Sequence, residues 1–205
     1  TVVVQALTDH QRILFNGNGY EDAWIAEAEK RGLANLKDAP RAFATYLSDQ
    51  NIKLFTSHGV FTITEMEARN EIHFESYCKK LNIEALTMID MVHREILPAV
   101  SAYSKRLCDT VLSKKQAVPG LCCQVEEQTV SKITVLSKEL FDACAELERR
   151  VHTLPNLDAP ELSVYYHDTV FAQMEAVRAA ADALEPMIAS DFWPYPTYVD
   201  LLFSE

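Results

Sequence analysis

Several short stretches of this sequence contain residue types that carry out catalysis or bind ions. Two Asn-Gly pairs, residues 16–19, stand directly ahead of an amphipathic stretch, where a glycine-rich loop could present backbone N–H groups to a phosphate. No Lys or Arg follows directly to meet the charge, and Glu21 and Asp22 would repel a phosphate. Those acids suit the positive end of a helix dipole instead. The pattern therefore predicts a tight turn with positive φ at the glycines, followed by a helix.

A metal site has little support in the sequence. A di-metal carboxylate site in a helical bundle needs Glu-x-x-His on two helices, and the chain offers Asp90 with His93 as a single comparable pair. Glu71, His73 and Glu75 alternate, so on a helix they spread over too wide an arc to share a metal. We expect a solvated face here, and we assign no metal-binding residue.

Nucleophilic candidates are also isolated. Ser57 and His58 are neighbours, but no G-x-S-x-G motif surrounds them. The run of residues 165–168 looks reactive, yet at helical spacing its side chains fall on different faces, and we expect one of them to cap the core. Basic residues gather near the end of a long helical stretch, where they complement the negative end of the dipole: Lys105, Arg106, Lys114 and Lys115. The residues thus predict no catalytic and no cofactor-binding group.

The cysteines indicate a reducing compartment. Their number is odd and no CxxC spacing occurs among them: Cys78, Cys108, Cys122, Cys123 and Cys144. Three fall inside helical patterns, so we predict buried, reduced thiols in a cytoplasmic protein. A redox or metal role for the vicinal pair at 122–123 is the alternative, which no nearby Cys/His set supports.

Composition narrows the class of protein. The chain has 205 residues, 48% apolar and 24% charged, with 5 glycines, which is typical of a globular helical protein. The net charge of −11 argues against nucleic-acid or anionic-membrane partners. No run of 18 apolar residues predicts a membrane span, and the first residues lack the features of a signal peptide. The absent initiator Met suggests part of a longer polypeptide.

The predicted fold is all-α: an antiparallel bundle of long helices after a shorter helical N-terminal segment, with an irregular aromatic C-terminal tail. Residues 5–14 and 21–31 read as short helices, the second ended by Gly32 at the C′ position. Asp38 and Pro40 read as the start of a helix that runs through Leu47.

The strongest apolar pattern belongs to one long helix that starts at a capping box at Thr62 or Thr64 and ends at 118–120. One stripe steps by threes and fours: Leu81, Ala85, Met88, Val92, Ile96, Ala99, Tyr103, Leu107 and Val111. A second line joins it: Ile83, Leu86, Ile89, Leu97 and Val100. So wide an arc predicts burial on more than one side. Pro98 predicts a kink near residues 94–95.

Two further long helices are expected over residues 124–153 and 161–189. Their predicted inner faces are Val130, Ile133, Leu136, Leu140, Ala143, Leu147 and Val151, and then Val164, Phe171, Met174, Val177, Ala181 and Leu184. Short loops predict antiparallel neighbours, with three or four helices left open. The ending "DFWPYPTYVDLLF" predicts a tail that docks on its own protein or on a neighbouring subunit; a ligand for a proline-reading groove is the alternative.

Four stretches together resemble the C-terminal region of type III glutamine synthetases, the long-subunit bacterial form. They are "RILFNGNGYEDAWIAEAEKRGLANLKDAP", "IKLFTSHGVFTITEMEARNEI", "YCKKLNIEALTMIDMVHREILPAVSAYSKRL" and "WPYPTYVDLLF". The resemblance runs from about residue 11 to the end and is weaker between 113 and 185. "TVVV" at residues 1–4 reads as a remnant of the last helix of a catalytic domain.

The resemblance implies a parent enzyme that joins ammonia to glutamate with ATP and Mg or Mn, built as a homo-dodecamer. The family's "NGSGKH" and "EFR" motifs do not occur here, and Tyr20 and Glu21 follow "NGNG", so no catalytic, nucleotide-binding or metal residue is carried over. We expect a connector over residues 1–60, a bundle over 61–190 and a docking tail over 191–205. Their implied role is assembly with the catalytic domain and neighbouring subunits, with the stretch inactive by itself. A free-standing interaction or regulatory module is the alternative.

Overall fold

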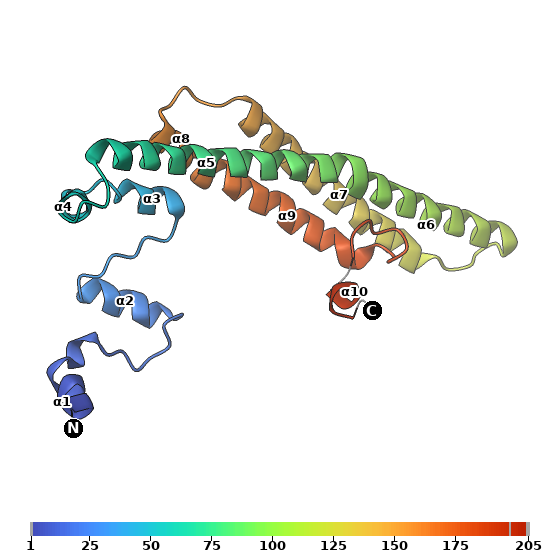
Figure 1. Cartoon of the computed structure of the whole chain (residues 1–205). Coiled ribbons are helices and arrows are strands. Elements are labelled where there is room, and N and C mark those ends of the chain that lie inside the picture. Colours follow the sequence, from blue (N-terminus) through green and yellow to red (C-terminus); the bar gives the residue numbers. More distant parts are fainter. Residues whose placement is uncertain (1, 197, 204–205) are drawn as a thin grey trace.

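The computed structural model describes residues 2–196 and 198–203, and of Tyr198 and Val199 the backbone only. Within these residues every regular element is a helix and no strand occurs, which confirms the all-α prediction (Figure 1). Thr1, part of the "TVVV" stretch, and Thr197, Ser204 and Glu205, part of the predicted tail, lie outside the described residues.

Three rods form the bundle (Figure 1). The first consists of α5 (Ile63–Met91), the π turn η2 (Val92–Ile96) and α6 (Leu97–Ala117). The second is α7 (Gln124–His152), which returns antiparallel to α6 and then α5. The third consists of α8 (Ala159–Tyr165), the π turn η3 (Tyr166–Phe171), α9 (Ala172–Leu184) and the 3-10 turn η4 (Glu185–Met187). The bundle therefore closes with three rods.

The first rod begins at the predicted capping box. The backbone N–H of Glu65 donates to Thr62 Oγ1 at 3.3 Å, and the N–H of Thr62 donates to Glu65 Oε2 at 2.8 Å. These bonds satisfy two donors that a helix start leaves free. The hydrogen bond from the Thr62 backbone also lowers the pKa of Glu65.

A π turn interrupts the first rod where Pro98 predicts a distortion. Proline cannot donate to the carbonyl one turn earlier, so the regular hydrogen-bond pattern fails just before it. The turn η2 covers residues 92–96, which includes the predicted position 94–95, and Pro98 occupies the first turn of α6.

A second π turn, η3, changes which residues of the third rod face the core. Tyr166 and Val170 are 3% and 0% exposed, whereas Val164 and Phe171 are 37% and 39% exposed. The prediction that Val164 and Phe171 line the inner face is therefore wrong. A π turn holds more residues than an α turn, so it rotates the side chains on one side of it relative to the other.

The centre of the core is one stripe of α7. Ile133, Leu140 and Leu147, spaced by seven residues, are 0% exposed, and Cys144 shares the same seam. They pack between the other two rods, against Ala85, Val92 and Val100 among others on one side and Val170, Val177 and Leu184 on the other. Seven-residue spacing is typical of helices that pack nearly antiparallel along their whole length.

Only part of the wide apolar arc of the first rod is buried. Ile89 and Val100 are 8% and 2% exposed, as predicted. Ile83 and Leu86 are 63% and 40% exposed, so for these two the expectation of burial is wrong within this chain.

The N-terminal elements are short: α1 (Val2–Asp9), the 3-10 turn η1 (Gln11–Ile13), α2 (Asp22–Lys30), α3 (Ala39–Ala44) and α4 (Asp49–Ser57). The helix predicted over residues 5–14 is thus an earlier helix and a separate turn. The helix predicted to run through Leu47 ends at Ala44, and the unpredicted α4 begins after Ser48.

Gly32 and Gly59 end α2 and α4 with positive φ of 72° and 63°. After α2, the N–H of Leu33 donates to Ala28 O and the N–H of Gly32 to Glu29 O, both at 2.9 Å, which is the Schellman arrangement. Gly17 and Gly19 do not have positive φ, so the turn geometry predicted for the Asn-Gly pairs is wrong. The side chain of Asn18 forms the turn instead, because its Oδ1 accepts from the N–H of Tyr20 at 3.0 Å.

We call residues 2–37 the N-terminal arm. It extends away from the bundle in Figure 1. All of its residues are described, and Ala28 is the buried one among them.

We predict that Leu140→Ala lowers the free energy of unfolding by about 2–5 kcal/mol, because the truncation leaves a cavity in the fully buried α7 seam. Val135→Ala on the same helix, where the side chain is 58% exposed, serves as the matched control and should change it by less than about 0.5 kcal/mol. Urea unfolding followed by circular dichroism measures both. Equal effects would contradict the assignment of the α7 seam.

Candidate functional site

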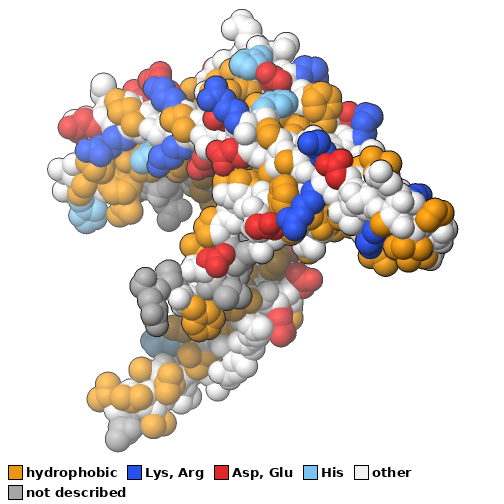
Figure 2. Space-filling model, turned by 90° about the vertical axis from the view of Figure 1, so that its right-hand side faces the viewer, with side chains coloured by type: hydrophobic (Ala, Val, Ile, Leu, Met, Phe, Trp, Pro, Cys, Tyr) orange, Lys and Arg blue, Asp and Glu red, His pale blue; other side chains and the backbone are white. Residues whose placement is uncertain are grey.

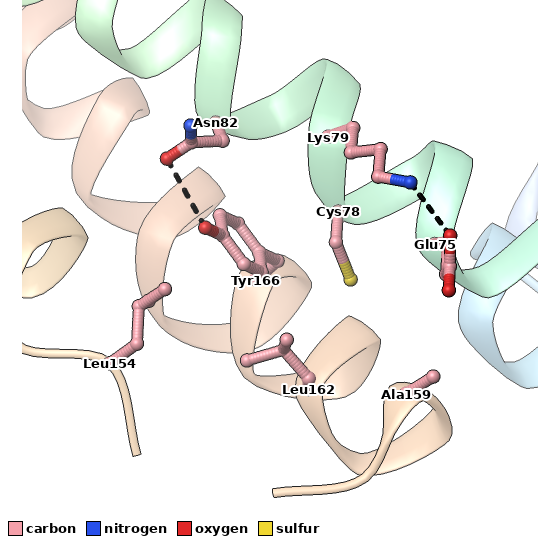
Figure 3. Close-up of a pocket in the computed structure, with 8 residues that line it drawn as sticks. All are labelled: Glu75, Cys78, Lys79, Asn82, Leu154, Ala159, Leu162 and Tyr166. Carbon is pink, nitrogen blue, oxygen red and sulfur yellow. Dashed lines mark hydrogen bonds and ion pairs between the residues drawn. The ribbon is translucent and has the colours of Figure 1, made fainter. Parts of the chain in front are cut away.

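A hollow lies between α5 and α8, beside η3 (Figure 3). It measures about 430 Å³ and is lined by Glu75, Cys78, Lys79, Asn82, Leu154, Ala159, Leu162 and Tyr166. Leucine side chains and the Tyr166 ring form its walls, and Lys79 and Glu75 form part of its rim. No sequence motif indicates this hollow, because its residues come from two stretches far apart in the chain, residues 75–82 and 154–166.

The polar groups of the hollow already have partners. The Tyr166 hydroxyl donates to Asn82 Oδ1 at 3.2 Å, and Lys79 Nζ donates to Glu75 Oε2 at 2.7 Å (Figure 3). Burial raises the pKa of the Cys78 thiol and of the Tyr166 phenol. Both therefore stay protonated at neutral pH, so neither is activated as a nucleophile or a base.

The candidate metal ligands are directed to separate partners. Asp90 pairs with Arg94 at 2.7 Å, while His93 Nε2 lies 3.6 Å from Cys144 Sγ. The His73 ring stacks on Phe43 at a centroid distance of 5.1 Å. Among the described residues, no three His, Cys, Asp or Glu side chains converge on one point.

The nucleophile candidates lie in ordinary helix-end positions. The Ser57 hydroxyl donates to Leu54 O at 3.2 Å, and His58 is the residue that closes α4. Ahead of α2, Asn18 Nδ2 donates to Glu21 Oε1 at 3.1 Å, so the Asn-Gly stretch holds a carboxylate where a phosphate would have to lie.

The side chains of the run 165–168 do not converge on one site: Tyr165 contacts α7 and Tyr166 contacts α5, whereas His167 contacts Asp168 within the run. The Tyr165 hydroxyl donates to Arg150 O at 3.2 Å, and Tyr166 is the buried member that contacts α5. His167 Nδ1 lies 2.6 Å from Asp168 Oδ1. This arrangement follows the helical spacing, with the π turn adding further divergence.

Asp168 ties the N-terminal part of the chain to the bundle. Arg41 of α3 bridges Asp38 Oδ2 at 2.7 Å and Asp168 Oδ2 at 3.1 Å. The hydrogen bond with His167, followed by that with Arg41, lowers the pKa of Asp168. Nothing in the sequence indicated this link, since 127 positions separate the two residues.

The basic run near the end of α6 is paired with carboxylates. Arg106 Nη1 lies 2.9 Å from Asp191 Oδ2, Lys115 Nζ lies 2.6 Å from Glu127 Oε1, and Lys114 pairs with Glu126. Lys105 approaches Asp109 at 4.0 Å. The run therefore fastens α6 to α7 and to the C-terminal tail, beyond its predicted role at the dipole.

The described part of the tail packs on the bundle. The Phe192 ring lies 5.4 Å from the Tyr103 ring, and the Arg106 guanidinium lies 5.4 Å above Phe192. Trp193 and Tyr195 lie against the core near η2. Burial raises the pKa of Tyr195 to about 12, and the nearby Glu95 carboxylate contributes to this rise. The Tyr195 hydroxyl is buried and forms no hydrogen bond with the described residues. Beyond it, α10 (Tyr198–Leu202) exposes Leu201 and Leu202.

All five cysteines are free thiols. Cys78, Cys123 and Cys144 are buried, as predicted, whereas Cys108 and Cys122 are exposed, so the prediction of buried thiols is wrong for these two.

Large apolar side chains remain exposed along the N-terminal arm, which projects from the bundle in Figure 2. They are Val2, Val3, Val4, Leu7, Ile13, Leu14, Tyr20, Leu33 and Leu36. Surfaces of this kind mark contacts with other parts of a protein. In the described part of the chain, no helix has the length and apolar character needed to cross a membrane.

Comparison with known proteins gives a consistent set of relatives. Residues 1–115 match the glutamine synthetase C-terminal domain family. A glutamine synthetase of Butyrivibrio fibrisolvens is 39% identical over 204 residues, which are 99% of this chain and 29% of that protein. A type-3 glutamine synthetase of Dictyostelium discoideum is 31% identical over 98% of this chain and 28% of its own length. A glutamine synthetase of Bacteroides fragilis is 28% identical over 94% of this chain and 27% of its own. The chain thus spans less than a third of these curated relatives.

We predict that iodoacetamide at pH 8 alkylates Cys108 and Cys122 quickly and Cys144 only after denaturation. Burial raises the pKa of Cys144 to about 11, so only about one thiol in a thousand is a thiolate at pH 8. Raising the pH toward 11 should increase the thiolate fraction and weaken the fold, since the folded state holds the proton more tightly than the unfolded state.

Mass spectrometry of digested protein locates the label, and the exposed Cys108 provides the internal control. Rapid alkylation of Cys144 at pH 8 in the folded protein would contradict the packing of the α7 seam.

Proposed function

The chain belongs to the glutamine synthetase C-terminal domain family, and we propose that it is the C-terminal helical part of a type III glutamine synthetase. The parent enzyme would join ammonia to glutamate in the cytoplasm, with ATP as the phosphate donor and Mg or Mn as the metal. The helical part would hold the catalytic part and neighbouring subunits in place. The relatives support the parent activity, because the ones named above are glutamine synthetases and the type-3 form is among them.

The observation that carries the structural role is the uncovered N-terminal arm. Val3, Leu7, Ile13 and other apolar side chains of the arm are exposed although the arm is helical and amphipathic in part. Leaving a large aliphatic side chain in water forgoes about 1.5–3 kcal/mol of burial free energy. An arm with so little buried surface needs a partner that covers it. We propose that this partner is the remainder of the parent polypeptide, because the relatives are more than three times as long as this chain.

The polar groups of this stretch support a role without chemistry of its own. Some of its carboxylates form ion pairs with Arg and Lys neighbours, as Asp168 does with Arg41. Glu146 is held by Arg149 and Arg150, whose hydrogen bonds lower its pKa to about 2. Among the described residues, no three His, Cys, Asp or Glu side chains are grouped to hold a metal ion. We therefore derive no catalytic step here and place ATP and metal in the remainder of the parent.

The first test is the denatured intact mass of the natural gene product that contains this sequence. We expect a mass several-fold above the 23.2 kDa of this chain, together with phosphate release that depends on ATP, glutamate and ammonia. A product near 23.2 kDa would overturn the proposal and leave a free-standing interaction or regulatory module.

The second test places a charge in the docked tail of the full-length protein. Trp193→Glu should weaken assembly or lower glutamine formation, because a carboxylate cannot be buried against the apolar core without a partner. Gln128→Glu, which adds the same charge at an exposed position of α7, is the matched control.

Native mass spectrometry and a glutamine assay read out both variants. If Trp193→Glu keeps the native mass and turnover of the control, the tail is not an assembly contact.

A further inference from the structure

The outer face of α5 carries an apolar stripe that points away from the core. Ile72 and Ile83 are 59% and 63% exposed, and Leu86 is 40% exposed. Ile72 and Ile83 stand eleven residues apart, about three full turns, so they lie on the same side of the helix. Each is two positions from a buried residue, Phe74 and Leu81 respectively, which is about half a turn around the axis. Ala68 is also exposed and extends the stripe.

We infer that this face pairs with the same face of a second copy of the chain, antiparallel, about a two-fold axis near residue 77. In that register Ile72 meets Ile83 of the second copy, and Ala68 meets Leu86. The two positions of each pair are equidistant from residue 77 to within one residue. All of them lie on one side of the helix, so a single contact line includes both pairs. A two-fold contact of this kind is self-complementary.

Charge decides the orientation. Within the stripe, Glu75 and Lys79 flank the axis, and their side chains are 48% and 71% exposed. A parallel pair in register would place Lys79 against Lys79 and Glu75 against Glu75. The antiparallel pair places each Glu75 opposite Lys79 of the second copy, on the same side of the stripe, and does so twice. Like charges opposed across an interface are unfavourable, whereas alternating charges fix the register.

The same contact would cover the hollow beside α5. Glu75 and Lys79 form part of its rim, and Leu154, which also lines it, is 42% exposed (Figure 3). A second copy seated on the stripe therefore removes water from both the stripe and the edge of the hollow. The pairing goes beyond the proposed function, which assigns no contact to α5.

Disulfide trapping in the full-length protein tests the pairing. The background is Cys108→Ser with Cys122→Ser, which removes the exposed thiols. Two single variants, Ile72→Cys and Ile83→Cys, are compared with the double variant. Within one helix the two positions are about 16 Å apart, too far for a disulfide inside one chain.

Under mild oxidation we expect at least tenfold more covalent dimer from the double variant than from either single variant. Peptide mapping should show the 72–83 link between chains. Ile72→Cys paired with Val135→Cys, which is exposed on α7, is the matched control and should give no enrichment.

Three results would overturn the inference. A dimer formed equally well by Ile72→Cys alone would indicate parallel pairing. Absence of dimer with both new thiols shielded from iodoacetamide would mean that another part of the polypeptide covers the stripe. Absence of dimer with both thiols reactive would mean that the stripe is uncovered. Glutamine formation is not part of this readout, so the pairing and the proposed function can fail separately.

Discussion

The whole bundle depends on one stripe of α7 that must be buried on two sides at once. Ile133, Leu140 and Leu147 repeat every seven residues and are completely shielded from water. A helix that presents one seam to two neighbours requires both neighbours to remain in register over its full length. The two π turns lie in those neighbouring rods, next to the α7 seam. Each turn rotates the side chains that follow it about the helix axis, so that the apolar face of the rod stays directed at the seam. The seam therefore determines the three-rod arrangement.

Features of this fold that depend on a few neighbouring residues could be predicted from the sequence. The direction in which side chains face after a π turn could not. The helix end at Gly32 and the cap at Asp38 depend on a few neighbouring residues, so their patterns were sufficient. The capping box was predicted at Thr62 or Thr64, and the structure places it at Thr62. The inner face of the third rod was misassigned because η3 changes the phase by an amount that side-chain periodicity does not reveal. The start of α4 after Ser48 was missed since that cap makes no side-chain hydrogen bond and leaves a weak signal.

Which polar groups of this stretch pair with one another appears only in three dimensions. Glu75 forms an ion pair with Lys79. Asp168 forms an ion pair with Arg41, which lies more than a hundred residues earlier in the chain. The buried thiols of Cys78 and Cys144 are held in the protonated form by desolvation. The hollow between α5 and α8 has the size of a ligand site but presents neutral or mutually paired groups, so its geometry favours covering by apolar surface over chemistry.

The wide apolar arc of the first rod shows why a sequence pattern cannot say what covers a surface. Near η2 the outer part of the arc is met by Trp193 and Tyr195 from the tail, so one end of the rod is completed within the chain. Toward the start of the rod, Ile72 and Ile83 are also apolar but stay in water. Periodicity reports the apolar face of a helix and not its partner. The difference lies in the tail, whose Trp193 and Tyr195 lie beside η2 and α9. The apolar face of α5 that the tail does not cover is the one inferred above to pair with a second copy.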